Sequence, residues 1–248
     1  MKIKHLLCFI ALCLFFTPGK AQQLSVMTLR NGATVYIWED KSKPDVFGMI
    51  AFKVGSVDDP EQYTGLAHYL EHVMFKGTQT IDALDWEKEK PIYEKIIAKY
   101  DERAALSDPA AREAVDKEIN DLTREAAQYA AGNEFSLLVD HMGGQGLNAS
   151  TGYDQTEYHN SFPPSQLEKW LEIYSERLID PVFRGFQTEL EAVYEEYNMY
   201  NDDRGSRMRE FIYEQAFGDH PYARPIIGLP EHLKNCLLYT SPSPRDRG

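Results

Sequence analysis

Hydrophobic and polar residues alternate over short runs near the start of the chain, and this pattern predicts strands. The runs 24–29 and 34–39 are apolar and β-branched, and Arg30-Asn31-Gly32-Ala33 separates them. Asn-Gly between two such runs is the strongest short-range signal for a β-hairpin. A third apolar run, 46–54, ends at Gly55-Ser56 before an acidic turn. We therefore expect a sheet to begin with these three strands.

A helical period follows the strands. Leu66, Leu70 and Val73 form one stripe within 65–75, the spacing of a helix packed on a sheet. The charged, alanine-rich stretch 86–131 predicts an inserted helical hairpin, broken where Asp108 can cap a helix and Pro109 can begin it. The second helix of this hairpin carries an apolar stripe made of Val115, Ile119, Leu122, Ala126 and Tyr129.

The rest of the chain returns to a strand pattern after Gly132, with strands expected over 146–153 and 156–162. Ser165-Gln-Leu-Glu168 has the form of a capping box and predicts the start of a further helix. Its expected buried face consists of Leu167, Trp170, Leu171, Tyr174 and Leu178. A last helix, about 188–200, carries the acidic residues Glu189, Glu191, Glu195 and Glu196.

The two ends differ from the middle. Residues 1–21 have a basic start, an apolar run and a small-residue exit, which predict a secretory signal peptide and an exported, periplasmic or secreted protein. A membrane span is the alternative, but this run is short for a bilayer and no other long apolar run follows. Residues 236–248 resemble the translation of a sequencing adapter, so we expect a domain over 22–235 and a longer natural protein.

Composition limits the possible partners and metal ligands. The chain is 43% hydrophobic and 26% charged, as in ordinary globular proteins, and its net charge of −13 disfavours nucleic acid as a partner. All three cysteines, Cys8, Cys13 and Cys236, lie outside 22–235. Any metal in that domain must therefore be held by nitrogen and oxygen ligands, and no disulfide is available to stabilise it.

The motif His68-Tyr69-Leu70-Glu71-His72 carries the chemistry. Residues i and i+4 of a helix share a face, so His68 and His72 can bind one cation, and Glu71 lies beside them. H-x-x-E-H is the inverzincin signature. A catalytic zinc usually takes three protein ligands, so a third donor must come from elsewhere. The alternative is a polar helix face that binds no metal.

The surroundings of this motif resemble the active-site helix of the pitrilysin/insulinase family, which includes the mitochondrial processing peptidases. The residues that carry the resemblance are Gly65 to Thr78, Leu29 to Gly32, Val54 to Ser56, Gly146 to Thr151 and Asp154 to Tyr158. The resemblance implies an α+β fold, an antiparallel sheet with helices packed on one face, as in one processing-peptidase half. The strand-then-helix order is compatible with that fold.

The resemblance also implies a complete ligand set for one Zn²⁺ per chain. In Glu189-Leu-Glu-Ala-Val193-Tyr-Glu-Glu196 it assigns the third ligand to Glu196, and to Glu189 the carboxylate that orients a ligand. The alternative for this acidic run is a solvated surface helix, which is what we expect of Glu191 and Glu195. The remaining histidines have no partner at ligand spacing.

These residues predict a zinc endopeptidase acting on peptides or unfolded segments, with Glu71 as general base on the zinc-bound water. Asn148 and Ala149 resemble the family's edge-strand residues, which bind the substrate backbone by β-augmentation; an ordinary strand after a glycine turn is the alternative. The family encloses substrate between this half and a second, homologous half that carries an Arg-Tyr pair.

Other functions remain open from the sequence. The chain could be a non-catalytic or partner-dependent half of a two-subunit peptidase, although its motif is intact. The helical hairpin could bind a partner, but its self-complementary apolar stripes favour a packed appendage. We expect the fragment to bind zinc and to hydrolyse peptides slowly without its second half. No membrane span is expected after signal removal.

Overall fold

The computed structural model describes residues 24–233, so the predictions for 1–21 and 236–248 lie outside the described residues. The chain divides into two compact units, Met1–Pro44 and Asp45–Gly248. In the first unit, β1 (Leu24–Thr28) and β2 (Thr34–Trp38) pair antiparallel. Gly32 has a φ of +86°, and the Leu29 N–H donates to the Ala33 carbonyl at 2.8 Å. The predicted Asn-Gly hairpin is therefore confirmed.

The second unit contains a three-stranded antiparallel sheet. Its strands are β3 (Val46–Phe52), β4 (Gln145–Thr151) and β5 (Thr156–Phe162), in the order β3-β5-β4. Val46 lies opposite Phe162 and Phe52 opposite Thr156, while the β4–β5 register shifts between Gln145 and Asn148. The five strands predicted over 24–29, 34–39, 46–54, 146–153 and 156–162 all form, but β1 and β2 make a separate sheet rather than continuing into β3.

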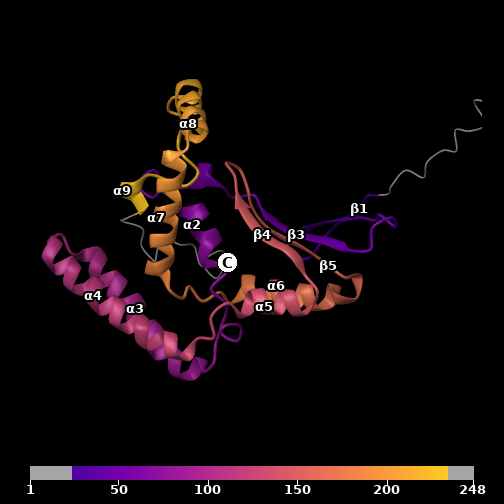
Figure 1. Cartoon of the computed structure of the whole chain (residues 1–248), viewed down its shortest axis with the longest axis horizontal. Coiled ribbons are helices and arrows are strands. Elements are labelled where there is room, and N and C mark those ends of the chain that lie inside the picture. The colour runs from indigo at the N-terminus through magenta and orange to yellow at the C-terminus, as the bar shows by residue number, and fades with distance from the viewer. Residues whose placement is uncertain (1–23, 234–248) are drawn as a thin grey trace, which may run out of the picture. The chain divides into compact units, whose positions relative to one another are not determined.

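Most of the other described residues of the second unit form helices (Figure 1). They are α2 (Leu66–Val73), α3 (Trp86–Ala105), α4 (Pro109–Ala126), α5 (Glu134–His141), α6 (Leu167–Ile179), α7 (Phe186–Asp202), α8 (Arg204–Phe217) and α9 (Pro230–Leu233). Short 3₁₀ turns cover Ser56–Asp58, Ala127–Tyr129, Pro164–Gln166 and Pro221–Ala223. With antiparallel strands and packed helices, the predicted α+β fold is confirmed. Among residues 24–233, no helix is both long and apolar enough to cross a bilayer.

Helices α3 and α4 lie side by side as a hairpin (Figure 1). Asp108 caps α4 as predicted, since its carboxylate accepts the Ala110 and Ala111 N–H groups at 3.4 and 3.3 Å. The apolar stripe of α4 is buried at Val115 and Ile119. These residues belong to one core cluster with α2, α3 and the start of α7. The Tyr100 ring of α3 lies 5.3 Å from the Phe186 ring of α7, so the hairpin packs on the start of α7, which in turn contacts the motif helix.

Asn160 joins α6 to the sheet. Its side chain is fully buried on β5, and its Oδ1 accepts from Trp170 Nε1 at 2.8 Å and from Tyr174 Oη at 2.7 Å. The Trp170 ring stacks on Phe162 at 5.2 Å. A Cβ on Gly48 would lie 2.7 Å from both of those rings. Only glycine therefore lets the β3 backbone approach this aromatic stack.

Three local predictions were wrong. Residues after Gly132 form α5 rather than a strand, because Phe135 and Val139, one helical turn apart, are buried together. The predicted capping box does not form: a 3₁₀ turn precedes α6, whose first residue has no side-chain cap. The buried face of α6 is also shifted, since Leu167 and Leu171 are 45% and 51% exposed. Ile173 and Arg177 are buried in their place.

The start of α2 is held by backbone close approach and by hydrogen bonds. A Cβ on Gly65 would lie 2.4 Å from the Ile227 carbonyl oxygen, and a Cβ on Gly228 would lie 2.3 Å from that of Thr64. The Thr64 hydroxyl accepts the Leu229 N–H at 3.0 Å. Segments 64–65 and 227–229, far apart in the sequence, therefore pack backbone to backbone at this helix end.

Candidate metal centre

Helices α2 and α7 bring His68, His72 and Glu196 together. Glu196 Oε2 lies 3.8 Å from His68 Nε2 and 3.4 Å from His72 Nε2. The two imidazole rings are 4.7 Å apart between centroids. One nitrogen or oxygen from each residue lies within 4.8 Å of the others. The three predicted ligands thus face a common point, although nothing in their sequence spacing places Glu196 there.

This arrangement fits a zinc ion. Ligand bonds of about 2.0–2.1 Å in tetrahedral geometry place donor atoms about 3.3 Å apart, close to the separations around Glu196. Two imidazoles and one carboxylate are donors that zinc accepts, and three protein ligands leave a fourth position for water or substrate. His68 Nδ1 is buried without a hydrogen-bond partner in the described structure, so its Nε2 is the nitrogen that faces the other donors.

The face of α2 next to the two histidines explains why this short helix holds its position. Tyr69 and Val73 are fully buried and lie in a core cluster with α7. The Tyr69 hydroxyl donates to the Phe186 carbonyl, and the two rings meet edge to face at 4.7 Å. Tyr69 and Val73 each follow a histidine by one residue, about 100° around the helix. Their packing against α7 therefore fixes the rotation of α2 about its axis, and with it the directions of His68 and His72.

Glu189 lies against His72 from the other side. Its Oε1 is 3.2 Å from His72 Nδ1, and its Oε2 forms an ion pair with Lys76 Nζ. This is the contact that a carboxylate makes when it orients a metal-binding imidazole. Glu191 and Glu195, by contrast, are exposed. Helix α7 thus presents Glu189 and Glu196 to α2, and the other two glutamates to solvent.

The two histidines have very different proton affinities. Burial, together with the charge of His72, lowers the pKa of His68 to about 4. Burial by itself would lower the pKa of His72, but hydrogen bonds to Glu189 and Glu196 outweigh it and raise this pKa to about 9. The hydrogen bond from His72 lowers the pKa of Glu196.

Glu71 is 8% exposed and faces the same cleft. The Thr151 hydroxyl at the end of β4 donates to Glu71 Oε2 at 2.7 Å. Burial raises the pKa of Glu71, and the hydrogen bond from Thr151 opposes that rise. The sequence placed Thr151 in the β4 motif without assigning it a role. Its position two residues after Ala149, on the same strand face, is the signal that could have assigned it.

Arg177 is a second residue that sequence reasoning missed. It is 1% exposed, its Nε donates to the Met74 carbonyl at 2.8 Å, and neither Nη has a partner within residues 24–233. The rings of Phe75, Tyr158 and Phe135 lie 4.1, 4.3 and 4.6 Å from its guanidinium carbon. Burial lowers the pKa of Arg177 to about 10. A cation thus lies buried just behind the helix that carries Glu71.

Asn148 and Ala149 line the same cleft, which has a volume of about 690 Å³. Both lie on β4, which pairs with β5 on one side and has no partner strand on the other within residues 45–233. Helix α8 contributes Ser206, Arg209 and Tyr213 to the lining of this cleft. An open strand edge therefore runs along the cleft that contains the clustered donors, which is the arrangement required for adding a peptide strand.

An α+β unit with an H-x-x-E-H helix and a distant glutamate defines the inverzincin class of peptidase. The family model for insulinase (peptidase family M16) matches residues 34–90 and 119–229, which is more than half of the chain. The chain therefore belongs to the insulinase family of peptidases, and the resemblance noted in its sequence is confirmed. The unmatched stretch 91–118 falls within α3 and α4.

Two similar proteins are named as zinc proteases. An uncharacterised zinc protease of Mycobacterium leprae is 26% identical over 182 residues, 73% of this chain and 30% of that protein. Zinc protease PqqE of Helicobacter pylori is 25% identical over 216 residues, 86% of this chain and 37% of that protein. The chain thus spans only about a third of the length of these relatives.

Solved structures show the same fold. A protease from Helicobacter pylori superposes with a TM-score of 0.64 at 22% identity, over 88% of this chain and 41% of the other. Pitrilysin superposes with a TM-score of 0.60 at 20% identity, over 92% of this chain and 19% of the other. At these identities the likeness concerns the fold.

Proposed function

We propose that this chain is the zinc-binding, catalytic half of a metalloendopeptidase, with one Zn²⁺ held by His68, His72 and Glu196. The observation that carries the proposal is the meeting of these three donors from α2 and α7 beside Glu71. The zinc proteases among its relatives support the choice of metal. When bound, zinc would acidify a water molecule and polarise a peptide carbonyl.

Glu71 is the general base in this proposal. Its carboxylate lies in a partly buried cleft, and Thr151 fixes one of its oxygens, so the other is left to accept a proton from water. Burial that raises the pKa of a carboxylate brings it closer to neutral pH, where a general base can also return the proton to the leaving amine.

The substrate is an extended peptide or an unfolded segment. The free edge of β4 at Asn148 and Ala149 offers backbone groups to a peptide strand, and such pairing requires an extended chain. Main-chain hydrogen bonds read little sequence, so we expect weak preference except where side chains meet α8. A folded or helical segment could not pair in this way.

A second, homologous half completes the enzyme in this proposal, either in the same chain or as a separate subunit. The support is that the chain spans only 30% and 37% of the two zinc proteases described above. The alternative function is a non-catalytic or partner-dependent half. The presence of His68, Glu71, His72 and Glu196 argues against the non-catalytic form. Export to the periplasm or outside the cell is also proposed, from the apolar amino-terminal run.

The test is zinc binding by the 248-residue chain, measured by competition with a chromophoric chelator. Glu196→Gln is expected to weaken binding by more than about 100-fold, a larger loss than for an outer-shell partner. Glu195→Gln changes an exposed carboxylate on the same helix and should bind like the wild type. Equal affinities for these two variants would remove Glu196 from the site.

The role of Glu71 needs a separate variant. Glu71→Gln keeps the side-chain shape and removes the base, so zinc binding should persist while peptide hydrolysis falls by about 100- to 10,000-fold. Hydrolysis is to be measured with the second half restored and a quenched fluorescent peptide as substrate. Full activity of this variant would show that another group takes the proton.

A further inference from the structure

We propose that Lys76 is a positioning residue for the metal centre, acting through Glu189, and that the α3–α4 hairpin holds Lys76 in place through Glu89 and Arg184. This inference rests on the proposed function, because it concerns how the zinc ligand His72 is oriented. It gives the α3–α4 hairpin a role in positioning a metal ligand. Neither the apolar packing of the hairpin nor the H-x-x-E-H motif implies such a role.

The first link is a carboxylate shared between two partners. Glu189 uses Oε1 for His72 Nδ1, at 3.2 Å, and Oε2 for the Lys76 ammonium. A carboxylate with one oxygen fixed by a cation cannot rotate without breaking an ion pair, so its other oxygen stays directed at the imidazole. Glu189 is only 15% exposed, and water therefore competes weakly for either oxygen. Lys76 thus sets the direction of the His72 contact.

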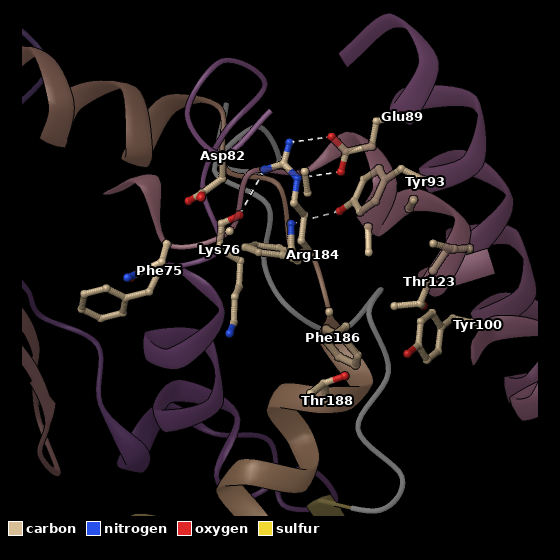
Figure 2. A pocket seen from close by; sticks show the side chains of 18 of the residues that line it. Phe75, Lys76, Asp82, Glu89, Tyr93, Tyr100, Thr123, Arg184, Phe186 and Thr188 are labelled. Atoms are coloured by element: carbon tan, nitrogen blue, oxygen red, sulfur yellow. Dashed lines mark hydrogen bonds and ion pairs between the residues drawn. The ribbon is translucent and has the colours of Figure 1, made fainter. Parts of the chain in front are cut away.

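The second link fixes the backbone of Lys76. Arg184 Nη1 donates to the Lys76 carbonyl at 3.1 Å, while its Nε and Nη2 donate to the two oxygens of Glu89 at 2.6 and 2.8 Å. Figure 2 shows the guanidinium between Glu89 and this carbonyl, with the Lys76 side chain extending away from the pair. One arginine therefore joins the start of α3 to the residue that holds Glu189.

Glu89 makes this link specific to the hairpin. It lies in the first turns of α3, is 1% exposed, and gives both oxygens to Arg184. A bidentate carboxylate–guanidinium pair fixes orientation as well as distance. Because Arg184 lies just before α7 begins at Phe186, the same pair also holds the entry to the helix that carries Glu189 and Glu196.

Apolar packing does not replace these polar links. A cavity of about 440 Å³ lies beside them, and Lys76, Glu89, Tyr93 and Arg184 all line it (Figure 2). The hairpin and the segment after α2 are thus incompletely packed at this point. Ion pairs and hydrogen bonds connect the two segments here, so we expect the removal of one of these charges to change the orientation of the His72 imidazole.

The test measures the zinc dissociation constant of the 248-residue chain carrying single and double substitutions. Lys76→Met, which removes the ammonium and keeps the length, is expected to weaken zinc binding about 10-fold, as loss of an outer-shell partner typically does. Lys76→Arg should restore affinity to within about threefold of the wild type, because it restores the cation. Circular dichroism of each variant reports whether it is folded.

The hairpin is tested by Glu89→Gln, alone and combined with Lys76→Met. If the hairpin acts through Lys76, Glu89→Gln should weaken zinc binding severalfold in the wild type and have no further effect in the Lys76→Met background. The matched control is Glu118→Gln, which changes an exposed carboxylate elsewhere in the same hairpin and removes its 2.5 Å ion pair with Lys99. It should leave zinc affinity unchanged.

Each outcome decides between the two proposals. A folded Lys76→Met chain that binds zinc as tightly as the wild type overturns the inference and leaves the metal site intact. Independent, multiplicative effects of the Lys76 and Glu89 substitutions would limit the hairpin to a general structural role and so refute its link through Lys76. A wild-type chain that binds no zinc overturns the proposed function and this inference with it.

Discussion

Asp59 lies buried below the first turn of α2, with both carboxylate oxygens committed to backbone donors. Oδ2 accepts the Gly65 N–H at 2.7 Å and Oδ1 the Ala67 N–H at 2.9 Å. Burial raises the pKa of Asp59 to about 6, against the opposing effect of these two hydrogen bonds. The neighbouring charges act in opposite directions, since Arg224 lowers this pKa and Asp58 raises it.

This shift predicts that the Asp59 contribution to stability falls as pH rises. The folded state holds the Asp59 proton more tightly than the unfolded state, whose carboxyl has the ordinary pKa of 3.8. The contribution is therefore complete below about pH 4 and is lost as pH rises through 6, by up to about 3 kcal/mol. Urea unfolding of the wild type and of Asp59→Asn at pH 4.5, 5.5 and 6.5 measures it.

The informative quantity is the difference in unfolding free energy between wild type and Asp59→Asn. Asparagine cannot ionise, so other carboxyl groups cancel in this difference and Asp59 alone changes it with pH. A difference that stays constant from pH 4.5 to 6.5 would contradict the raised pKa.

At the scale of residues, the site residues that lie on one helix were predictable from their spacing. Those that come from distant segments were not. His68, Glu71 and His72 follow from helical spacing alone. Glu196 required the family resemblance, because four glutamates share α7 and only packing selects the ones that face α2. Thr151 on β4 donates a hydrogen bond to Glu71, and Arg177 on α6 donates to the Met74 carbonyl at the end of α2. No pattern along one segment predicts a contact between two distant segments.

At the scale of secondary-structure elements, the backbone of β3 meets the Phe162–Trp170 aromatic stack at Gly48. Gly48→Ala is expected to destabilise the protein by about 1–3 kcal/mol, because its Cβ would meet Phe162 and Trp170 at 2.7 Å. Gly152→Ala is the control, since its Cβ would meet only the Gln155 carbonyl, at an ordinary 3.6 Å. Chemical denaturation measures both, and equal stabilities would mean that the stack has room to move.

The elements that were predicted well are those whose pattern has a single interpretation. Alternating strands flanked by turn residues formed where expected, and Asp108-Pro109 marked the start of α4. Helix α5 was missed because its eight residues give barely two turns of periodicity. The shifted face of α6 has another cause, which is the burial of Arg177. A sequence pattern assigns a charged residue to the surface, and the aromatic rings that surround Arg177 come from other segments.

At the scale of the whole molecule, the chain spans only about a third of the length of the zinc proteases it resembles. We expect the 248-residue chain to bind zinc yet to hydrolyse peptides at least about 100-fold more slowly than the enzyme with its second half, because substrate orientation and exclusion of water would be incomplete. Rates with one quenched fluorescent peptide, with and without the second half, test this. Equal rates would show that this half suffices.

The fold class followed from the order of strands and helices together with the family resemblance. The division of the strands into two sheets did not, because the hydrophobic pattern of a strand does not specify its neighbour. The length of the hairpin was visible in the sequence as a charged, alanine-rich insertion. The ion pair between Glu89 and Arg184 was not, since Glu89 resembles any other acidic residue near the start of a helix.

The backbone contact between Gly65 and Gly228 has a consequence for the order of events during synthesis. The motif histidines leave the ribosome early, but the segment that packs against the start of their helix, like Glu196, comes near the end of the described chain. A partly made chain thus contains the motif histidines but lacks both Glu196 and the segment that packs against the start of their helix. Loading of the proposed ion would therefore follow synthesis of the domain, and stalled or shortened chains would carry no metal.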